Sequence, residues 1–176
     1  MKKLTGTMEA IRMKYLFHAT IALATLASAT AVAEPVRVEA VMSPKEQIRL
    51  DFEDGSKHFV LMVRREGRAE GSAIFEGASV VEYGMHDIVP GIGGDPRGYL
   101  VLAFPSGDTA YLKWQVRAVF VPGADGKPML LDNGFWEVAG GTGRFAGMKG
   151  AGTLHIKAVN QTDRRFILEG DVVPEG

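Results

Sequence analysis

The sequence predicts an all-β domain folded as an antiparallel eight-stranded β-barrel, with no substantial helix after an N-terminal leader. Apolar and polar residues alternate with a period of two along most of the chain, as expected of half-buried strands. The longest such run, TAYLKWQVRAVFV, extends from Thr109 to Val121, and strands of that length are more typical of barrels than of small open sheets. Turn-forming residues recur at short intervals between the runs, which favours short antiparallel connections.

Residues 1–33 have the pattern of a signal peptide. Lys14 provides a positive charge, the segment from Tyr15 to Ala27 is apolar or small, and Ala31-Val32-Ala33 matches an A-x-A cleavage site. Met13 is a candidate for the true start, because the residues before it add nothing to this pattern. The alternative is an amphipathic helix, which Pro35 and the strand-like pattern after it disfavour. We therefore expect an exported protein, either periplasmic or secreted.

Residues 34–176 have the length of a single domain. The chain contains no cysteine, which excludes disulfides, thiolate metal sites and a cysteine nucleophile. Acidic residues outnumber basic ones in this part and no basic patch is interleaved with aromatic residues, so we expect no nucleic-acid partner. His58, His86 and His155 lack metal-ligand spacing, so no metal and no cofactor are expected. No membrane insertion is expected after cleavage of the leader.

Alternation places the strands between clusters of turn residues. The expected strands, in chain order, are residues 36–42, 47–54, 57–65, 68–77, 79–85, 98–105, 109–121, 134–140, 152–159 and 164–173. Asp54-Gly55, Glu66-Gly67 and Asn133-Gly134 suit tight hairpins, because glycine adopts positive φ without steric cost.

The segment from Phe59 to Val63 is apolar on both of its faces. Phe59, Leu61 and Val63 alternate with Val60 and Met62, whereas a barrel hides only its inner face. The outer face must therefore be covered, either by a terminal segment of the chain or by a second copy. The second interpretation predicts a homo-oligomer.

A glycine-rich stretch, GGTGRFAGMKGAG, begins at the end of the predicted strand 134–140. Its first part matches a dinucleotide-binding fingerprint, but that fingerprint requires a helix immediately afterwards, and the further glycines and the return to a period of two argue against one. We expect a strand-to-strand corner instead, in which Phe145 closes the end of the barrel. The residues assigned to this corner are Gly140, Gly141, Thr142, Gly143, Phe145 and Gly150.

The stretch VAGGTGRFAGMKGAGTL, between Trp136 and Leu154, resembles the late segment of the allene oxide cyclase and dirigent protein superfamily. The resemblance implies an eight-stranded antiparallel barrel with an apolar central cavity, commonly oligomeric. It also implies activity on oily or phenolic small molecules without a cofactor. Allene oxide cyclases use a glutamate and an asparagine near the first strand, whereas this chain has Glu39 and Pro44 there without the asparagine. No catalytic role is therefore carried over from that family.

The segment VEYGMHD gathers polar residues at a predicted strand end. Glu82, Tyr83 and His86 lie there beside Asp87, and a long turn follows. A histidine beside a carboxylate at a barrel mouth could act as a general acid or base, whereas the simpler interpretation is a polar rim and turn cap.

The strand containing Trp114 has two alternating faces. If Leu112, Trp114 and Val116 face inward, then together with Trp136 they predict an aromatic-walled site for an apolar or ring-bearing ligand. The alternatives are that these side chains fill the core, or that the opposite face with Arg117 lines a polar lumen.

These observations support three hypotheses for function. The first is an exported barrel that binds an apolar or aromatic small molecule in its central cavity. The second is a cofactor-independent cyclase or isomerase that acts in the same cavity, which predicts a buried acid or base with a shifted pKa. The third is a structural or interaction barrel with a filled core and no cavity.

Overall fold

The computed structural model describes residues 32–72, 74–124 and 126–174. Almost all of the predicted signal peptide therefore lies outside the described residues. The strands are β1 (Glu34–Asp51), β2 (Phe59–Ser72), β3 (Ser79–Val89), β4 (Gly93–Gly94), β5 (Arg97–Ala103), β6 (Thr109–Pro122), β7 (Pro128–Gly141), β8 (Lys149–Ala158) and β9 (Arg164–Val173). Within the described ranges, the single helical segment is the short 3-10 turn η1 (Gly143–Phe145), and no helix is long and apolar enough to cross a membrane.

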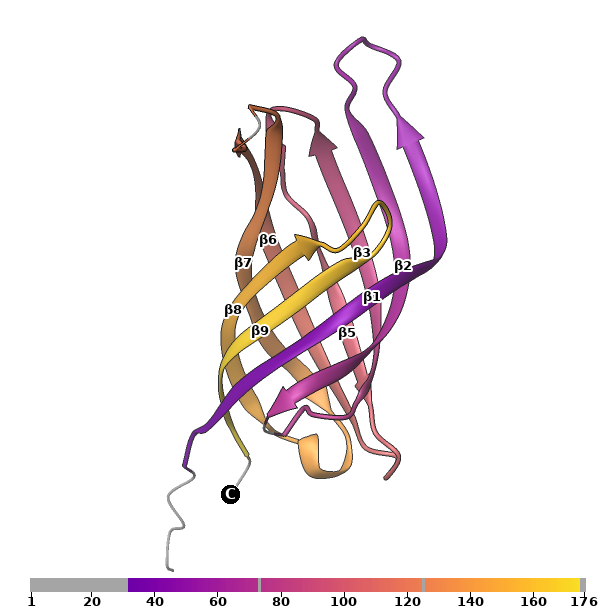
Figure 1. The fold of residues 1–176 in the computed structure, drawn as a ribbon. Helices are drawn as coiled ribbons and strands as arrows, with labels where there is room; N and C mark the ends of the chain where they lie inside the picture. Colours follow the sequence, from indigo (N-terminus) through magenta and orange to yellow (C-terminus); the bar gives the residue numbers. More distant parts are fainter. Residues whose placement is uncertain (1–31, 73, 125, 175–176) are drawn as a thin grey trace, which may run out of the picture.

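The strands form one closed antiparallel barrel, which confirms the predicted fold class (Figure 1). Each long strand pairs with its neighbours in the order β2, β1, β9, β8, β7, β6, β5 and β3, and the pairing of β3 with β2 closes the ring. The two-residue strand β4 bridges β3 and β6 at one end. Four hairpin connections, including β1–β2 and β6–β7, gather at that end, which is called the hairpin end below (Figure 1).

Two of the three predicted glycine hairpins are wrong. Asp54-Gly55 does turn the chain between β1 and β2, and Gly55 has φ +82°. Gly67 and Gly134, however, lie within the long strands β2 and β7. A Cβ on Gly67 would lie 2.4 Å from the carbonyl oxygen of Val41, and one on Gly134 would lie 2.0 Å from that of Gln115. These two glycines therefore permit close approach of the neighbouring strand rather than a turn.

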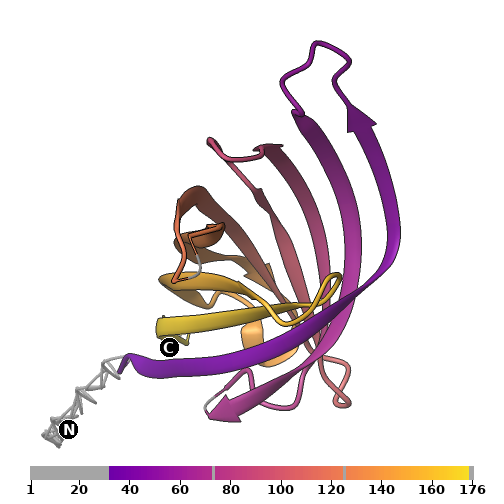
Figure 2. The ribbon, with the colours of Figure 1, turned by 45° about the horizontal axis from the view of Figure 1, so that its top comes forward.

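The β1–β2 hairpin extends beyond the wall of the barrel (Figure 2). The predicted strand 36–42 and residues 47–51 of the predicted strand 47–54 belong to β1, which continues through a register shift between Pro44 and Glu46. After this bulge both faces of β1 are accessible, and the side chains of Ile48 and Leu50 are 67% and 58% exposed. The predicted alternation with a period of two is correct in this part of β1, but neither face of the strand is buried there.

The interior is packed with large apolar side chains over the half of the barrel away from the hairpin end. Trp114, Trp136, Phe75, Phe145 and Phe166 are among the largest fully buried side chains. The ring of Phe145 lies 4.9 Å from that of Phe104 and 6.0 Å from that of Phe75, and closes this end. A void of about 10 Å³ remains among the surrounding aliphatic side chains, which is about the size of one water molecule. This half of the barrel has a filled core.

Candidate functional site

A cluster of charged side chains lies inside the barrel between the filled core and the hairpin end. Arg65 on β2 donates from Nη1 to Oε2 of Glu82 on β3, at 2.7 Å. Nε2 of His86 lies 3.1 Å from Oε1 of Glu82 and 3.1 Å from Nη1 of Arg65. The side chains of Arg65 and Glu82 are buried, and that of His86 is nearly so. Because isolated buried charges are costly, this mutual pairing is required for the three groups to lie in the interior.

Glycine at position 84 allows Glu82 and His86 to meet. In a strand, residues four positions apart share a face, but the side chain at the position midway between them normally separates them. That position is Gly84, and a Cβ there would lie 2.4 Å from Oε1 of Glu82 and 2.9 Å from Nε2 of His86. The motif Glu-x-Gly-x-His therefore brings a carboxylate and an imidazole together along one strand. Because a carboxylate has no proton to donate, we assign the Nε2 proton of His86 to this bond, in which Oε1 of Glu82 accepts.

Asp132 on β7 and Arg164 on β9 extend the cluster. Burial raises the pKa of Asp132 above its ordinary value, and the positive charges of His86, Arg164 and Arg65 offset only part of this effect. Burial and the neighbouring charge of Arg65 lower the pKa of Arg164. The Arg164 guanidinium also donates to the backbone carbonyl of Asp163 at 2.8 Å. Burial therefore favours the protonated form of the Asp132 carboxyl.

Three buried polar atoms around this cluster have no hydrogen-bond partner among the described residues. They are Nε of Arg65, Nε1 of Trp114 and Oδ1 of Asp132. The Trp114 ring lies 5.8 Å from that of His86, so the indole forms the boundary between the charged cluster and the apolar core. Buried polar groups are nearly always hydrogen-bonded, so each of these three atoms is a candidate contact for a further molecule, water included.

Beyond the cluster, the inward positions nearest the hairpin end are apolar and partly accessible. Phe59 and Leu61 lie on the same inward face of β2 as Arg65, and both are half-buried. Phe120 and Leu130 pair across β6 and β7, and Leu130 is exposed. The hairpin end therefore presents an apolar rim above a charged floor.

The structure separates the three predicted acid–base candidates. Glu82 and His86 face inward, whereas Tyr83 lies between them in sequence and points outward, with 52% of its surface exposed. A hydrogen bond with Tyr83 is the main reason that the pKa of Arg64 on the outer face is raised. Tyr83 therefore belongs to the outer surface, because successive strand residues alternate between faces.

The predicted ligand-binding residues on β6 face inward, and Lys113, Gln115 and Arg117 face outward. Leu112, Trp114 and Val116 are buried, as is Trp136 on β7. They pack in the filled core, so no aromatic-walled cavity separates them. Of the four, Trp114 also reaches the charged cluster. The glycine-rich corner lies at the opposite end, where Gly140 and Gly141 end β7, Thr142 precedes η1 and Gly150 is the second residue of β8, beside Asp171.

Arg65, Asp132 and Arg164 were not among the sequence candidates. The sequence did contain a sign of them, because each occupies an inward-facing position in a strand whose other inward-facing residues are mostly apolar. On those faces Arg65 follows Val63, Asp132 precedes Gly134 and Trp136, and Arg164 precedes Phe166. A charged residue in the apolar phase of a strand indicates a buried charge. Within the described ranges, no group of three or more histidine, aspartate or glutamate side chains is placed to hold a metal ion.

The sequence matches no protein-family model and no curated protein sequence. The fold is similar to that of the pterocarpan synthase dirigent protein PsPTS1, with a TM-score of 0.50 and 12% identity over 82% of this chain and 97% of that one. Two further solved structures align less closely: the pterocarpan synthase dirigent protein GePTS1 (TM-score 0.49, 12% identity, 92% and 100% covered) and a pyocyanin demethylase (TM-score 0.44, 16% identity, 77% and 99% covered).

The similarity to PsPTS1 shows that the chain has a dirigent-like barrel fold. This is the coarser part of the resemblance that the glycine-rich corner predicted. The more specific resemblance to allene oxide cyclases receives no support from the structures named above.

Proposed function

We propose that this barrel binds an apolar or aromatic small molecule at its hairpin end, with a polar group of the ligand seated on the interior charged cluster. The observation that carries the proposal is the set of unpaired buried atoms, Nε of Arg65, Nε1 of Trp114 and Oδ1 of Asp132. A barrel whose core is otherwise filled gains nothing in stability from burying them, since each costs about 1–3 kcal/mol. The similarity to dirigent proteins supports the fold alone, so the site carries the functional argument.

The charges of the cluster favour a ligand with an electron-rich oxygen. When Asp132 is protonated, the two guanidinium groups of Arg65 and Arg164 face the single carboxylate of Glu82. Two donors, on Arg65 and Trp114, remain available to such an oxygen. The apolar rim formed by Phe59, Leu61, Phe120 and Leu130 would contact the body of the ligand.

Native mass spectrometry of protein purified without detergent tests this proposal. We expect a stoichiometric additional mass that dissociates on collisional activation and that is depleted in Asp132→Asn. Replacement of both partners of the buried pair, Arg65→Met with Glu82→Met, removes that ion pair from the charged floor while keeping side-chain volume similar. Retention of the additional mass in both Asp132→Asn and this double variant would show that the cluster does not bind the ligand.

Cofactor-independent isomerase or cyclase chemistry at the same site is a second proposal, supported by the raised pKa of Asp132 next to His86. A buried acid with a shifted pKa beside a histidine is suited to proton transfer. Incubation of the bound ligand in D₂O would then exchange a carbon-bound hydrogen for deuterium, and Asp132→Asn would abolish this exchange. Equal exchange in both proteins would contradict a role for Asp132.

We also propose self-association through the projecting β1–β2 hairpin. Ile48 and Leu50 are more than half exposed there, which is uncommon for neighbouring large apolar side chains. Light scattering at micromolar concentration should give a mass above that of one chain, and Leu50→Glu should lower it. A monomeric mass for the unmodified protein would remove this proposal.

A further inference from the structure

A groove crosses the outer face of the barrel, on the side of the sheet opposite to the charged cluster. Its volume is about 870 Å³, and it extends over β2, β3, β5 and β6 to the end of β1. Val63, Gly84, Gly98 and Trp114 are in register across these four strands, and their backbones form the floor. Because the side chains of Val63 and Trp114 point inward and Gly84 and Gly98 have none, the outer surface of this floor is free for contact.

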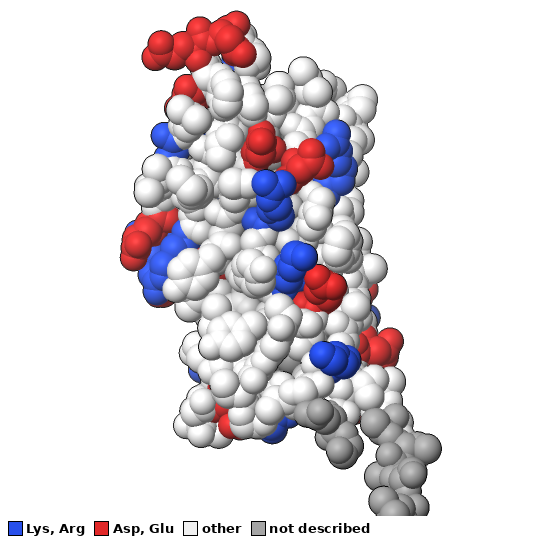
Figure 3. Space-filling model, turned by 180° about the vertical axis from the view of Figure 1, so that it is seen from behind, with Lys and Arg blue, Asp and Glu red and all other residues white. Residues whose placement is uncertain are grey.

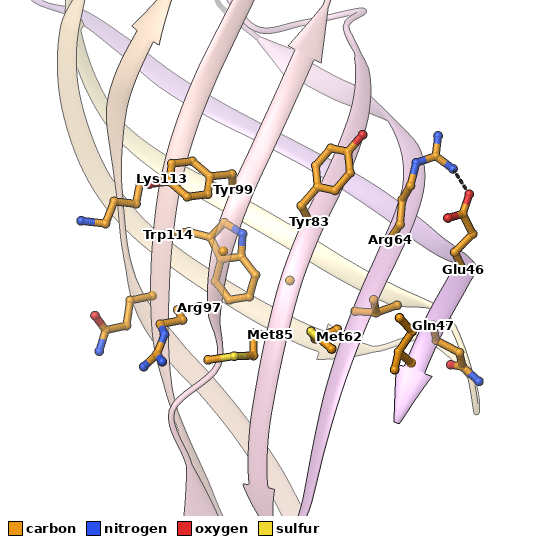
Figure 4. Close-up of a pocket in the computed structure, with 15 residues that line it drawn as sticks. Glu46, Gln47, Met62, Arg64, Tyr83, Met85, Arg97, Tyr99, Lys113 and Trp114 are labelled. Carbon is orange, nitrogen blue, oxygen red and sulfur yellow. Dashed lines mark hydrogen bonds and ion pairs between the residues drawn. The ribbon is translucent and has the colours of Figure 1, made fainter. Parts of the chain in front are cut away.

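Two parallel rows of side chains form the walls of the groove (Figure 4). The register places Arg64, Tyr83, Tyr99 and Lys113 in one row and Met62, Met85, Arg97 and Gln115 in the other. The side chains of Tyr83, Tyr99 and Met62 are each about half exposed. Aromatic and thioether groups of this kind adapt to flat apolar ligands.

Three basic side chains, Arg64, Arg97 and Lys113, and one acidic side chain, Glu46, line the groove. Arg64 is paired with Glu46 and Glu66, and Lys113 makes one exposed ion pair with Glu137 at 3.4 Å. Arg97 makes no hydrogen bond or ion pair with any side chain in the part of the chain that the structure describes. It lies diagonally across β5 and β6 from Lys113, on the same face. Figure 3 shows that most of this side of the molecule is uncharged, with separate acidic and basic side chains between the white areas.

We propose that this groove is a second binding site, specific for an amphipathic organic anion. The apolar body of the anion would lie against Tyr83, Tyr99 and the methionines, and its acidic group would pair with Arg97 and Lys113. The volume is in the range of small-molecule sites, and the unpaired guanidinium supplies the charge complementarity. Ile48, which also belongs to the proposed self-association surface, lies at the β1 edge of the groove, so a second copy seated there would compete with the anion.

A pair of fluorescent probes with nearly the same aromatic body tests the proposal. 8-Anilinonaphthalene-1-sulfonate carries a negative charge, whereas N-phenyl-1-naphthylamine is neutral. We expect saturable binding of the anionic probe at one site, weakened about fivefold by Arg97→Gln, while binding of the neutral probe changes little. In the unmodified protein, 1 M salt should weaken only the anionic probe, because salt screens exposed charges.

Two control variants separate this groove from other sites. Arg117 also lies on the outer face of β6 but outside the groove, and it is paired with Asp95 at 2.7 Å, so Arg117→Gln should leave both probes unaffected. Asp132→Asn alters the interior cluster and should also leave the anionic probe unaffected. An Arg97→Gln affinity equal to that of the unmodified protein would overturn the proposal. Loss of probe binding as the light-scattering mass rises would also overturn it, because a second copy would then cover the groove.

Discussion

Trp114 and Trp136 lie opposite each other on β6 and β7, but only one indole has a hydrogen-bond partner. Nε1 of Trp136 donates to the backbone carbonyl of Glu169 at 3.3 Å, whereas Nε1 of Trp114 is buried with no partner among the described residues. Both rings pack in the core, so burial alone does not distinguish them. The hydrogen bond indicates a structural role for Trp136, and the unpaired donor associates Trp114 with the ligand site.

Replacing each tryptophan by phenylalanine should therefore have different effects. Trp136→Phe removes a satisfied donor and should lower the free energy of unfolding by about 1 kcal/mol more than Trp114→Phe does. Trp114→Phe should reduce the amount of co-purified ligand, while Trp136→Phe should retain it. Urea unfolding and native mass spectrometry measure the two quantities. Equal losses of stability together with equal ligand occupancy would contradict this division of roles.

Gly84→Ala should disrupt the contact between Glu82 and His86. The added methyl would lie 2.4 Å from Oε1 of Glu82, so one of the two side chains must move. We expect a loss of about 1–3 kcal/mol in the free energy of unfolding, typical of overpacked interiors. Gly140→Ala is the matched control, because a Cβ there has no atom within 4 Å and should be tolerated. Similar stabilities for the two variants would argue against a packed contact above Gly84.

The fold could be predicted from the sequence because alternation and turn composition report local structure. The apolar phase of β6, with Leu112, Trp114 and Val116, is sufficient to orient that strand correctly. Glu66-Gly67 and Asn133-Gly134 misled the prediction, because a glycine that permits close strand approach has the same local signature as one that turns the chain. That distinction depends on the neighbouring strand.

The site could be predicted only in part. Glu82 and His86 share one strand and one face, so their proximity was encoded locally. Arg65, Asp132 and Arg164 come from three other strands, and their convergence follows from barrel closure. The outward position of Tyr83 follows from alternation alone and could have been recognised.

Replacing one partner of the buried Arg65–Glu82 pair should lower the free energy of unfolding more than replacing both partners. Arg65→Met leaves the Glu82 carboxylate buried beside His86 without its guanidinium, so we expect a loss of about 3–5 kcal/mol. Addition of Glu82→Met should recover much of this loss, because a methionine pair has no charge to solvate. Chemical unfolding of the single and double variants measures the difference. A double variant no more stable than the single one would show that the Glu82 carboxylate is not destabilising when it is buried without Arg65.

The predicted leader gives a precise expectation for the mature chain. Cleavage after Ala33 would leave Glu34 as the first residue, which is also the first residue of β1. Intact-mass measurement of protein from the cell envelope should therefore give the mass of residues 34–176. Replacing Ala31 and Ala33 with larger residues should block cleavage, because the signal peptidase site requires small side chains. An intact N-terminus in the mature protein would contradict the signal-peptide prediction.

Asp132 should make the protein less stable at neutral pH than it would be with an uncharged side chain. The pKa of Asp132 is raised in the folded state by burial, so the folded protein holds this proton at pH values where the unfolded chain has released it. Its favourable contribution is fully present below the pKa of the unfolded chain and is lost as pH rises through the raised pKa of the folded state. Asp132→Asn cannot ionise and avoids that loss.

We therefore expect Asp132→Asn to exceed the unmodified protein in free energy of unfolding at pH 7, by on the order of 1 kcal/mol. The difference should shrink as pH falls toward 4, because the unmodified carboxyl then becomes protonated. Thermal unfolding between pH 4 and 8 measures this, with the exposed Asp95→Asn as the control for a general charge effect. A variant less stable than the unmodified protein at pH 7 would show that attraction to Arg65, Arg164 and His86 outweighs burial. Greater stability combined with loss of the bound ligand would instead mean that Asp132 is retained for binding at the expense of stability.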